Sequence, residues 1–375
     1  MTAIKNDGAV PLPIPVEQAE ARRPDPEALY AALDLGTNSC RMLVAQPNGS
    51  QFHVIDSFAK SVQLGRGLAR HGSLSRASID RTVAALRVCR KKLDHHKVTR
   101  MRLVATEACR RASNGPEFMR KIARETGLVL EIIRPEEEAR LAVISCAPLV
   151  SRNTEQLLVV DIGGGSTELV WIDLSKVAPP DRSRAIMRLH SGFECASNAS
   201  PFPGAKVIDW ISIPLGVATL KDQFADVRED GPRFALMSCH FEEKMAEFAP
   251  YQNVGWPQLG QNFQMIGTSG TVTTVAASHL DLRRYDRNKV DGLRMSTAQV
   301  DAVIQQYLEM GPEGRRRDAR IGPDRHALIL SGVAILQTLI RIWPTDRLSV
   351  ADRGLREGLL FALMSADGIL EDGLV

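Results

Sequence analysis

Two short segments of this chain place an aspartate directly before a turn of small residues. The first runs Ala32-Leu-Asp-Leu-Gly-Thr-Asn-Ser39, and the second runs Val160-Asp-Ile-Gly-Gly-Gly-Ser-Thr167. An apolar run enters each turn and another leaves it, which is the pattern of a β-hairpin with a tight connection. Such a turn is common by itself, but its repetition with the aspartate in place indicates a shared chemical task.

The second turn has the composition of a site for phosphate and a divalent cation. Three consecutive glycines lack Cβ atoms, so their N–H groups can approach a phosphate closely. The predicted phosphate-binding residues of this turn are Gly163, Gly164, Gly165 and Ser166. Asp161 and Glu168 flank the turn, and they are candidate ligands for Mg²⁺, a hard cation that takes a few carboxylates together with phosphate oxygens.

The first turn offers hydroxyl and amide side chains where the second has glycines. Its predicted phosphate-binding residues are Asp34, Gly36, Thr37, Asn38 and Ser39. A third turn, Gly267-Thr-Ser-Gly-Thr271, runs into a predicted helix, whose free N–H groups and dipole attract anions. Phosphate contacts are predicted there for Gly267, Ser269 and Gly270, although a helix cap without a ligand explains the same residues equally well.

Hydrolysis of a phosphoanhydride also needs a group that orients and deprotonates water. The run Pro135-Glu136-Glu137-Glu138-Ala-Arg140 supplies three candidate glutamates, although acidic residues at a helix start also compensate the helix dipole. Arg110 and Arg111 follow a predicted strand. Because the two side chains point in different directions, at most one of them is expected to bind a phosphate bidentately.

Helix and strand patterns alternate along the chain, which favours an α/β fold. The predicted strands cover residues 102–106, 128–133 and 210–216, with another from residue 264; the predicted helices cover 79–93, 117–126, 135–144, 272–279, 325–342 and 354–364. We call the turns in Ala32–Ser39 and Val160–Thr167 the Asp-Gly turns. One such turn in each half of the chain predicts two related domains that face one another. The stretch 175–207, rich in Pro, Ser and Arg, is predicted to be a long loop or insertion.

The bulk properties exclude several classes of protein. No run of about 20 apolar residues predicts a membrane span, and the first 27 residues lack the apolar stretch of a secretory signal, so we expect a flexible tail. The six cysteines form no CxxC pair, which fits a reducing cytoplasm. Basic residues gather between residues 81 and 124 and again at 315–320, either as solvated helix faces or as a surface for a polyanion. Aromatic residues make up only 5% of the chain, which favours a phosphate polymer over nucleic acid.

Taken in order, these motifs resemble the exopolyphosphatase / guanosine pentaphosphate phosphohydrolase family. The matching segments are Ala32–Ser39, Ala105-Thr-Glu-Ala-Cys-Arg-Arg-Ala-Ser-Asn114, Glu137-Glu-Ala-Arg140, Val160–Glu168, Gly267–Thr271, Ser331-Gly-Val-Ala-Ile-Leu336 and Asp352-Arg-Gly-Leu-Arg-Glu-Gly358. The resemblance covers roughly residues 28 to 365, and it implies the fold of sugar kinases, actin and heat-shock chaperones, with two ribonuclease-H-like domains around a cleft. We expect the first domain at residues 28–136 and the second at 137–370, with C-terminal helices that pack back on the first.

The resemblance also implies roles for individual residues. Glu138 is similar to the catalytic base, Asp161 and Glu168 to the acidic residues that bind magnesium together with Glu138, and Arg110 to the arginine at the phosphate site. Asn38, Gly163, Gly164 and Ser269 match phosphate-contacting turns. The resemblance also implies that the protein requires Mg²⁺, with K⁺ as a candidate activator. We further expect a cytoplasmic homodimer that binds neither nucleic acid nor a membrane.

The leading hypothesis is therefore an exopolyphosphatase that releases orthophosphate from inorganic polyphosphate. Guanosine pentaphosphate hydrolysis, a non-hydrolytic polyphosphate- or nucleotide-binding regulator and, more remotely, a sugar kinase are the alternatives. The chain departs from the family at Arg134-Pro135, where Ser-Gly is usual, and at Ala327, where an aspartate is common. It is also expected to lack the additional helical HD-type domain of longer members.

Overall fold

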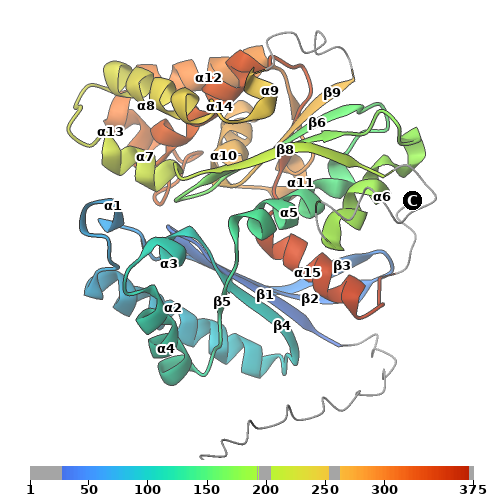
Figure 1. The fold of residues 1–375 in the computed structure, drawn as a ribbon. Helices are drawn as coiled ribbons and strands as arrows, with labels where there is room; N and C mark the ends of the chain where they lie inside the picture. Colours follow the sequence, from blue (N-terminus) through green and yellow to red (C-terminus); the bar gives the residue numbers. More distant parts are fainter. Residues whose placement is uncertain (1–27, 192, 194–203, 253–261, 371–375) are drawn as a thin grey trace, which may run out of the picture.

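The computed structural model describes residues 28–191, 193, 204–252 and 262–370, which form two α/β domains that face one another (Figure 1). The first 27 residues, the expected tail, lie outside the described residues. Within the described part of the chain, none of the helices has the length and apolar character needed to cross a bilayer.

The first sheet has the strand order β3-β2-β1-β4-β5. Its strands are β1 (Tyr30–Leu35), β2 (Ser39–Asn48), β3 (Gln51–Ser61), β4 (Arg100–Ala105) and β5 (Glu131–Ile132). The strands β1, β2 and β3 form an antiparallel meander, while β4 lies parallel to β1 and β5 parallel to β4. The strand predicted at residues 128–133 is shorter than expected, because only Glu131 and Ile132 pair with β4.

The second sheet repeats this topology in the order β10-β11-β9-β6-β7-β8. Its strands are β6 (Gln156–Ile162), β7 (Thr167–Asp173), β8 (Lys206–Ile213), β9 (Phe263–Thr268), β10 (Arg294–Met295) and β11 (Leu348–Ala351). Again three antiparallel strands, β6 to β8, are followed by two parallel ones, β9 and β11. The internal repeat and the two-domain, actin-like α/β fold expected from the sequence are therefore confirmed.

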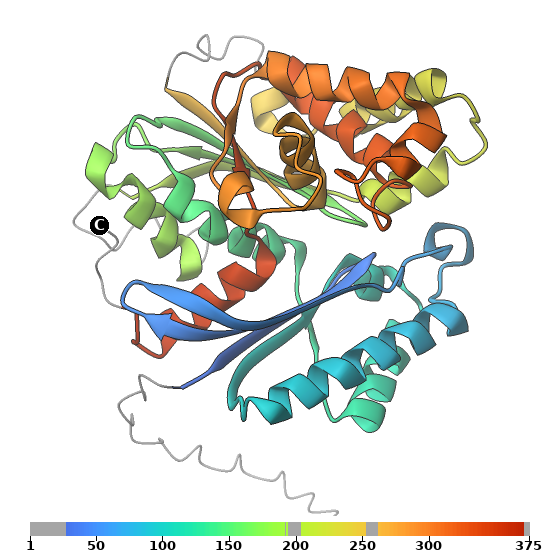
Figure 2. The ribbon, with the colours of Figure 1, turned by 180° about the vertical axis from the view of Figure 1, so that it is seen from behind.

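Helices cover the outer face of each sheet, and two more lie between the sheets. The α-helices are α1 (Leu68–His71), α2 (Arg76–His95), α3 (Glu107–Arg111), α4 (Gly115–Thr126), α5 (Pro135–Cys146), α6 (Arg182–Met187), α7 (Val217–Gln223), α8 (Asp230–Lys244), α9 (Ala249–Gln252), α10 (Gly270–His279), α11 (Arg287–Val290), α12 (Thr297–Glu309), α13 (Gly311–Arg317), α14 (Ile329–Ile342) and α15 (Leu355–Ala366). Three 3-10 turns are η1 (Ala147–Leu149), η2 (Pro179–Asp181) and η3 (Arg188–Ser191). Apolar residues of α2 and α4 form one core with the first sheet, and those of α8, α10, α12 and α14 form another with the second (Figures 1 and 2).

The helices α5 and α15 join the two domains. Ala139 and Val143 of α5 pack into the core under β6 and β7, whereas Leu141 and Ile144 pack with α15 against the first sheet. The C-terminal helix α15 thus covers the inner face of the domain to which it does not belong in sequence (Figure 2). Gly358 permits this close helix crossing, because a Cβ there would collide with the carbonyl of Leu141. The helices α5 and α15 are therefore packed between the two domains and connect them.

The stretch 175–207 is more ordered than the predicted loop. The described part contains η2, α6 and η3, and its residues Val177, Ala185, Ile186 and Leu189 are buried against the second sheet. The loop prediction failed because a helix of six residues is too short to show a period. Residues 194–203 of the expected insertion lie outside the described residues.

Candidate functional site

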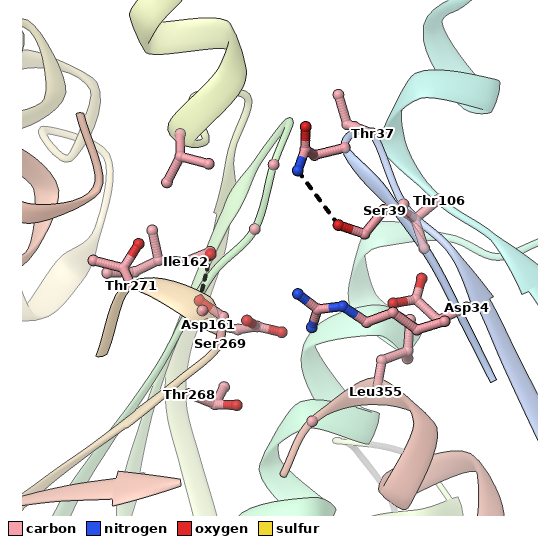
Figure 3. Close-up of a pocket in the computed structure, with 18 of the residues that line it drawn as sticks. Asp34, Thr37, Ser39, Thr106, Asp161, Ile162, Thr268, Ser269, Thr271 and Leu355 are labelled. Carbon is pink, nitrogen blue, oxygen red and sulfur yellow. Dashed lines mark hydrogen bonds between the residues drawn. The ribbon is translucent and has the colours of Figure 1, made fainter. Parts of the chain in front are cut away.

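A polar cavity of about 370 Å³ lies between the two sheets, where the two Asp-Gly turns approach each other (Figure 3). Most of the predicted site residues line it: Asp34, Gly36, Thr37, Asn38, Ser39, Glu138, Asp161, Gly163, Gly164, Gly165, Ser166, Ser269 and Gly270. The fold thus brings these residues to one cavity, although they come from segments more than 200 positions apart.

The two turns have the same backbone geometry. In the first, the N–H of Gly36 donates to the carbonyl of Ser39 at 2.9 Å; in the second, the N–H of Gly163 donates to that of Ser166, also at 2.9 Å. The chain that follows the third strand of each domain then donates back to the turn. Gly65 N–H bonds Thr37 O at 2.9 Å, and Ala218 N–H bonds Gly164 O at 2.8 Å. With their carbonyls engaged in this way, the turns leave N–H groups for the cavity.

The tips of the two turns touch. A Cβ at Gly164 would lie 3.1 Å from the backbone nitrogen of Asn38, and one at Gly165 would collide with Thr37 Oγ1. The glycines therefore have a second purpose besides the predicted phosphate cradle, since they let the opposite domain approach. Thr37 Oγ1 is buried and has no hydrogen-bond partner among the described residues, as expected of a group kept for a ligand.

Cross-strand pairing sets a different residue beside each aspartate. Asp34 lies opposite Arg41 of β2, whereas Asp161 lies opposite Glu168 of β7. Figure 3 shows Asp34 and Asp161 on opposite sides of the cavity. Arg41 also lines the cavity and makes no ion pair or hydrogen bond among the described side chains, so its guanidinium is available to an anion. Arg41 was not among the predicted site residues, although it follows Asp34 at the same spacing as Glu168 follows Asp161.

The second turn gathers carboxyl groups that resist ionisation. Burial raises the pKa of Asp161 to about 6, with a further increase from Asp34. Burial also raises the pKa of Glu138 to about 7, against the opposing effect of Arg110. The pKa of Glu168 is raised well above its usual value by burial and by Glu138, and Ser212 donates a hydrogen bond to Glu168 at 2.8 Å. Clustered acids of this kind are typical of an active site or a cation site.

Only one of the three adjacent glutamates reaches the cavity. Glu138, in the first turn of α5, is 8% exposed and lines the wall. Glu137 points elsewhere and accepts a hydrogen bond from Arg102 at 2.7 Å. The departure Arg134-Pro135 lies at the start of the same helix, where Arg134 is exposed and outside the cavity wall. The structure thus selects Glu138 on position alone.

Arg110 lies behind Glu138 and not in the cavity wall. Its Nη1 donates to Glu138 Oε2 at 2.8 Å, and its Nη2 donates to Glu107 Oε2 at 3.0 Å. The predicted direct contact between Arg110 and phosphate is therefore not the arrangement seen here, because buried carboxylates already occupy the guanidinium. Glu107, which does line the cavity, was missed by the sequence analysis.

Two further predicted residues also lie outside the wall. Glu168 is buried on β7, where it pairs across the strands with Asp161, and Gly267 is part of β9, where a Cβ would press on Val272 at 3.0 Å. The role of Gly267 is thus to fit a helix against a strand. Ser269, by contrast, lines the cavity and donates from Oγ to the carbonyl of Ile162 at 2.5 Å, which ties the third turn to the second.

Arginines also contribute to the cavity wall. Arg325, Arg353 and Arg356 line the cavity together with Arg41. Arg325 is positioned by its Nη1, which donates to the carbonyl of Gly270 at 3.0 Å. Arg353 and Arg356 belong to the C-terminal signature that the sequence displays, but nothing in that motif alone indicates that they point at the turns. Ala327, the second departure, is exposed and outside the wall, to which Asp324 contributes a carboxylate instead.

The residues present fit a hard cation whose coordination sphere is completed by oxygens of the substrate and of water. Over the described ranges, no group of three or more His, Cys, Asp or Glu side chains is arranged to hold a metal ion by itself. The donors facing the cavity are oxygens, including the carboxylates of Asp34, Glu138 and Asp161. Mg²⁺ commonly takes one or two carboxylates and fills its remaining positions with water and phosphate oxygens, so this donor set suits it.

The two basic segments do not form a free cationic surface. In the first, Arg87 pairs with Glu125 and Lys92 with Asp56. In the second, Arg315 is buried and pairs with Asp230, while Arg320 pairs with Asp318. These pairs offset part of the positive charge of both segments, which weakens the argument for a polyanion-binding surface.

The fold and the site together define a two-domain, actin-like α/β protein with one interdomain cavity that both carboxylates and arginines line. Residues 43–366 match the model of the Ppx/GppA phosphatase family, and this chain belongs to that family.

Individual relatives agree with this placement. The chain is 27% identical over 339 residues to the guanosine-5'-triphosphate,3'-diphosphate pyrophosphatase of Aeromonas salmonicida, a match that covers 90% of this chain and 59% of the relative. It thus spans well under two thirds of that relative's length. Among solved structures, the Ppx/GppA family member of Aquifex aeolicus is similar with a TM-score of 0.69 at 29% identity, covering 91% of this chain and 98% of that one. An exopolyphosphatase of Cytophaga hutchinsonii shares the fold, with a TM-score of 0.73 at 22% identity over 92% of this chain and 99% of that one.

Proposed function

We propose that this protein hydrolyses the terminal phosphoanhydride bond of inorganic polyphosphate and releases orthophosphate. The observation that carries the proposal is the position of Glu138, the only glutamate of its run that faces the cavity, where its carboxyl interacts electrostatically with those of Asp34 and Asp161. A carboxyl whose pKa is about 7 is well matched to accept a proton from water near neutral pH.

The other cavity residues bind and orient the chain of phosphates. Arg41, Arg325 and Arg356 provide cationic donors, which bind phosphate oxygens in bidentate geometry and offset charge that develops in the transition state. The N–H groups of the two turns and the unpartnered Thr37 hydroxyl complete the cradle around the terminal phosphate. Glu138 then takes a proton from the water that attacks the terminal phosphorus, while the bond from that phosphorus to the bridging oxygen breaks and the shortened chain leaves.

Asp161, Glu168 and Glu138 are the proposed carboxylates for Mg²⁺; Glu168 is the cross-strand partner of Asp161 and lies outside the cavity wall. When bound, the ion neutralises negative charge on the phosphates. The raised pKa values of Asp161 and Glu168 support this role, because a cation would stabilise their ionised forms. K⁺ activation and a homodimer remain proposals that rest on the family resemblance.

Guanosine pentaphosphate is the second candidate substrate, and the Aeromonas relatives favour it. The pairing of the basic segments removes one argument for a long polyanion. Against a nucleotide, no Phe, Tyr or Trp lines the described cavity wall, so no aromatic stacking surface for guanine lies inside it. A non-hydrolytic regulator is disfavoured, because the acidic groups that hydrolysis needs are present and face the cavity.

The test is phosphate release by the purified protein from short polyphosphate, long polyphosphate and guanosine pentaphosphate, each with and without Mg²⁺ and K⁺. We expect Mg²⁺-dependent release with a higher kcat/KM on polyphosphate. A higher kcat/KM on guanosine pentaphosphate would transfer the assignment to the second candidate, and binding without any release would support the regulator.

A further inference from the structure

The guanidinium of Arg110 is held by three acceptors at the back of the cavity. Its Nη1 donates to Glu138 Oε2 at 2.8 Å and to the carbonyl of Ile133 at 2.9 Å. Its Nη2 donates to Glu107 Oε2 at 3.0 Å. Glu107 and Glu138 are each only 8% exposed, so one arginine joins two buried carboxylates from different helices.

We propose that Glu107 is a positioning residue for hydrolysis: it fixes the guanidinium of Arg110, which in turn fixes the carboxylate of Glu138 toward the attacking water. The inference rests on the proposed role of Glu138 and adds a residue that the sequence motifs did not single out.

The planar geometry of the Arg110 guanidinium explains why Glu107 is needed. A guanidinium is planar, so holding Nη2 also fixes the direction of Nη1. Without Glu107, Nη2 would have no partner among the contacts above, and Arg110 could rotate about the remaining contacts of Nη1. Arg111 is the only other cation paired with Glu107 over the described residues, at 3.7 Å, and its side chain is 42% exposed. Arg111 therefore cannot take over the internal position.

Glu107 also contacts the opposite domain. A Cβ placed on Gly165 would lie 3.0 Å from Glu107 Cγ, so the stem of the glutamate packs on the second turn. The series Gly165, Glu107, Arg110 and Glu138 consequently connects the phosphate cradle to the base. A glutamate that merely compensated the dipole of the five-residue helix α3 would have no reason to be buried in this contact.

The experiment compares Glu107→Gln and Glu107→Asp with wild type in steady-state phosphate release from polyphosphate and guanosine pentaphosphate. We expect kcat to fall by about 10- to 100-fold, because a neutral glutamine or a shorter aspartate holds the guanidinium less firmly and the base loses its near-attack geometry, while KM stays within about twofold. Glu137→Gln is the matched control, since Glu137 pairs with Arg102 outside the cavity, and we expect its kcat to match wild type. Thermal melting verifies that each variant is folded. If Glu107→Gln does not fold, Glu107→Asp tests the proposal in its place.

A double-mutant cycle with Arg110→Gln separates positioning from direct participation. If Glu107 acts through Arg110, adding Glu107→Gln to Arg110→Gln should produce little further loss of kcat. Additive losses would overturn the inference and make Glu107 a base or metal ligand in its own right. Wild-type kcat in the folded Glu107 variants, or a rise in KM alone, would also overturn it. If Glu138→Gln abolishes turnover while the Glu107 variants are unaffected, the inference fails and the proposed function stands.

Discussion

The two hairpin turns have the same backbone and differ in the charge that each places beside its aspartate. Opposite Asp34 the first domain has Arg41, and opposite Asp161 the second domain has Glu168. The first turn thus adds a cation to the cavity, and the second gathers acids whose pKa values rise on burial. In the proposed phosphatase, the two copies of the duplicated fold would therefore have different tasks, the first binding phosphate and the second holding a cation beside Glu138.

The largest difference is expected between the two aspartates. Asp161→Asn should lower kcat by about 100-fold or more, because it removes a carboxylate proposed for the cation that neutralises the phosphates. Asp34→Asn should lower kcat by only about tenfold, since Arg41 and Arg356 already offset the charge of Asp34. Steady-state phosphate release measures both. Equal losses would break the division of labour between the turns.

The next test concerns the cross-strand partners. Arg41→Ala should raise KM by about 10- to 100-fold, because this is the usual loss of affinity when one charge-assisted hydrogen bond to a phosphate is removed. Glu168→Gln should instead lower kcat and leave KM nearly constant. A KM effect at Glu168 together with none at Arg41 would reverse the proposed roles.

A smaller effect should follow from crowding the contact between the turns. In Gly165→Ala the new methyl group would press on Thr37 and Glu107, so kcat/KM should fall by about tenfold. Gly36→Ala meets nothing closer than 3.5 Å and should cost less. Gly231→Ala, in open space on α8, controls for the change of residue type. If Gly165→Ala and Gly36→Ala behave alike, the closely packed turn contact is not needed for activity.

The smallest effect concerns stability. The pKa of Asp161 rises from an ordinary 3.8 to about 6 on folding, so the folded state carries an ionisation cost at pH 8 that the unfolded state does not. Asp161→Asn should therefore increase the free energy of unfolding at pH 8 by about 1 to 3 kcal/mol. The gain should shrink as the pH falls through 6 and become negligible near 3, below the ordinary pKa, where the carboxyl is protonated in both states. Urea unfolding at the three pH values measures it, and a loss of stability at pH 8 would contradict the assigned burial.

Much of the fold was predictable because its signals are local. Each Asp-Gly turn and its flanking strands lie within a few residues, and the repetition of the turn predicted the second domain. The three turns that line the cavity were visible as local motifs, whereas the run of glutamates left three candidates and only the family resemblance singled out Glu138.

What the sequence could not supply depends on partners far apart in the chain. The pairing of Lys92 with Asp56 and of Arg315 with Asp230 turned an apparent polyanion surface into structural ion pairs. Arg41 required the strand register, and the arrangement of Arg110 between Glu107 and Glu138 required the packing of α3 near α5. The brevity of β5 reflects tertiary pairing, which local β-propensity does not report.

The most direct test of the account compares Glu138→Gln with Glu137→Gln. The two residues are adjacent and chemically identical, but only Glu138 faces the cavity. With polyphosphate and Mg²⁺, Glu138→Gln should bind substrate with nearly unchanged affinity and release phosphate at least about 100-fold more slowly than wild type. Glu137→Gln should turn over normally. Near-normal phosphate release by Glu138→Gln would contradict the assignment of the base and, with it, the proposed division of labour between the two turns.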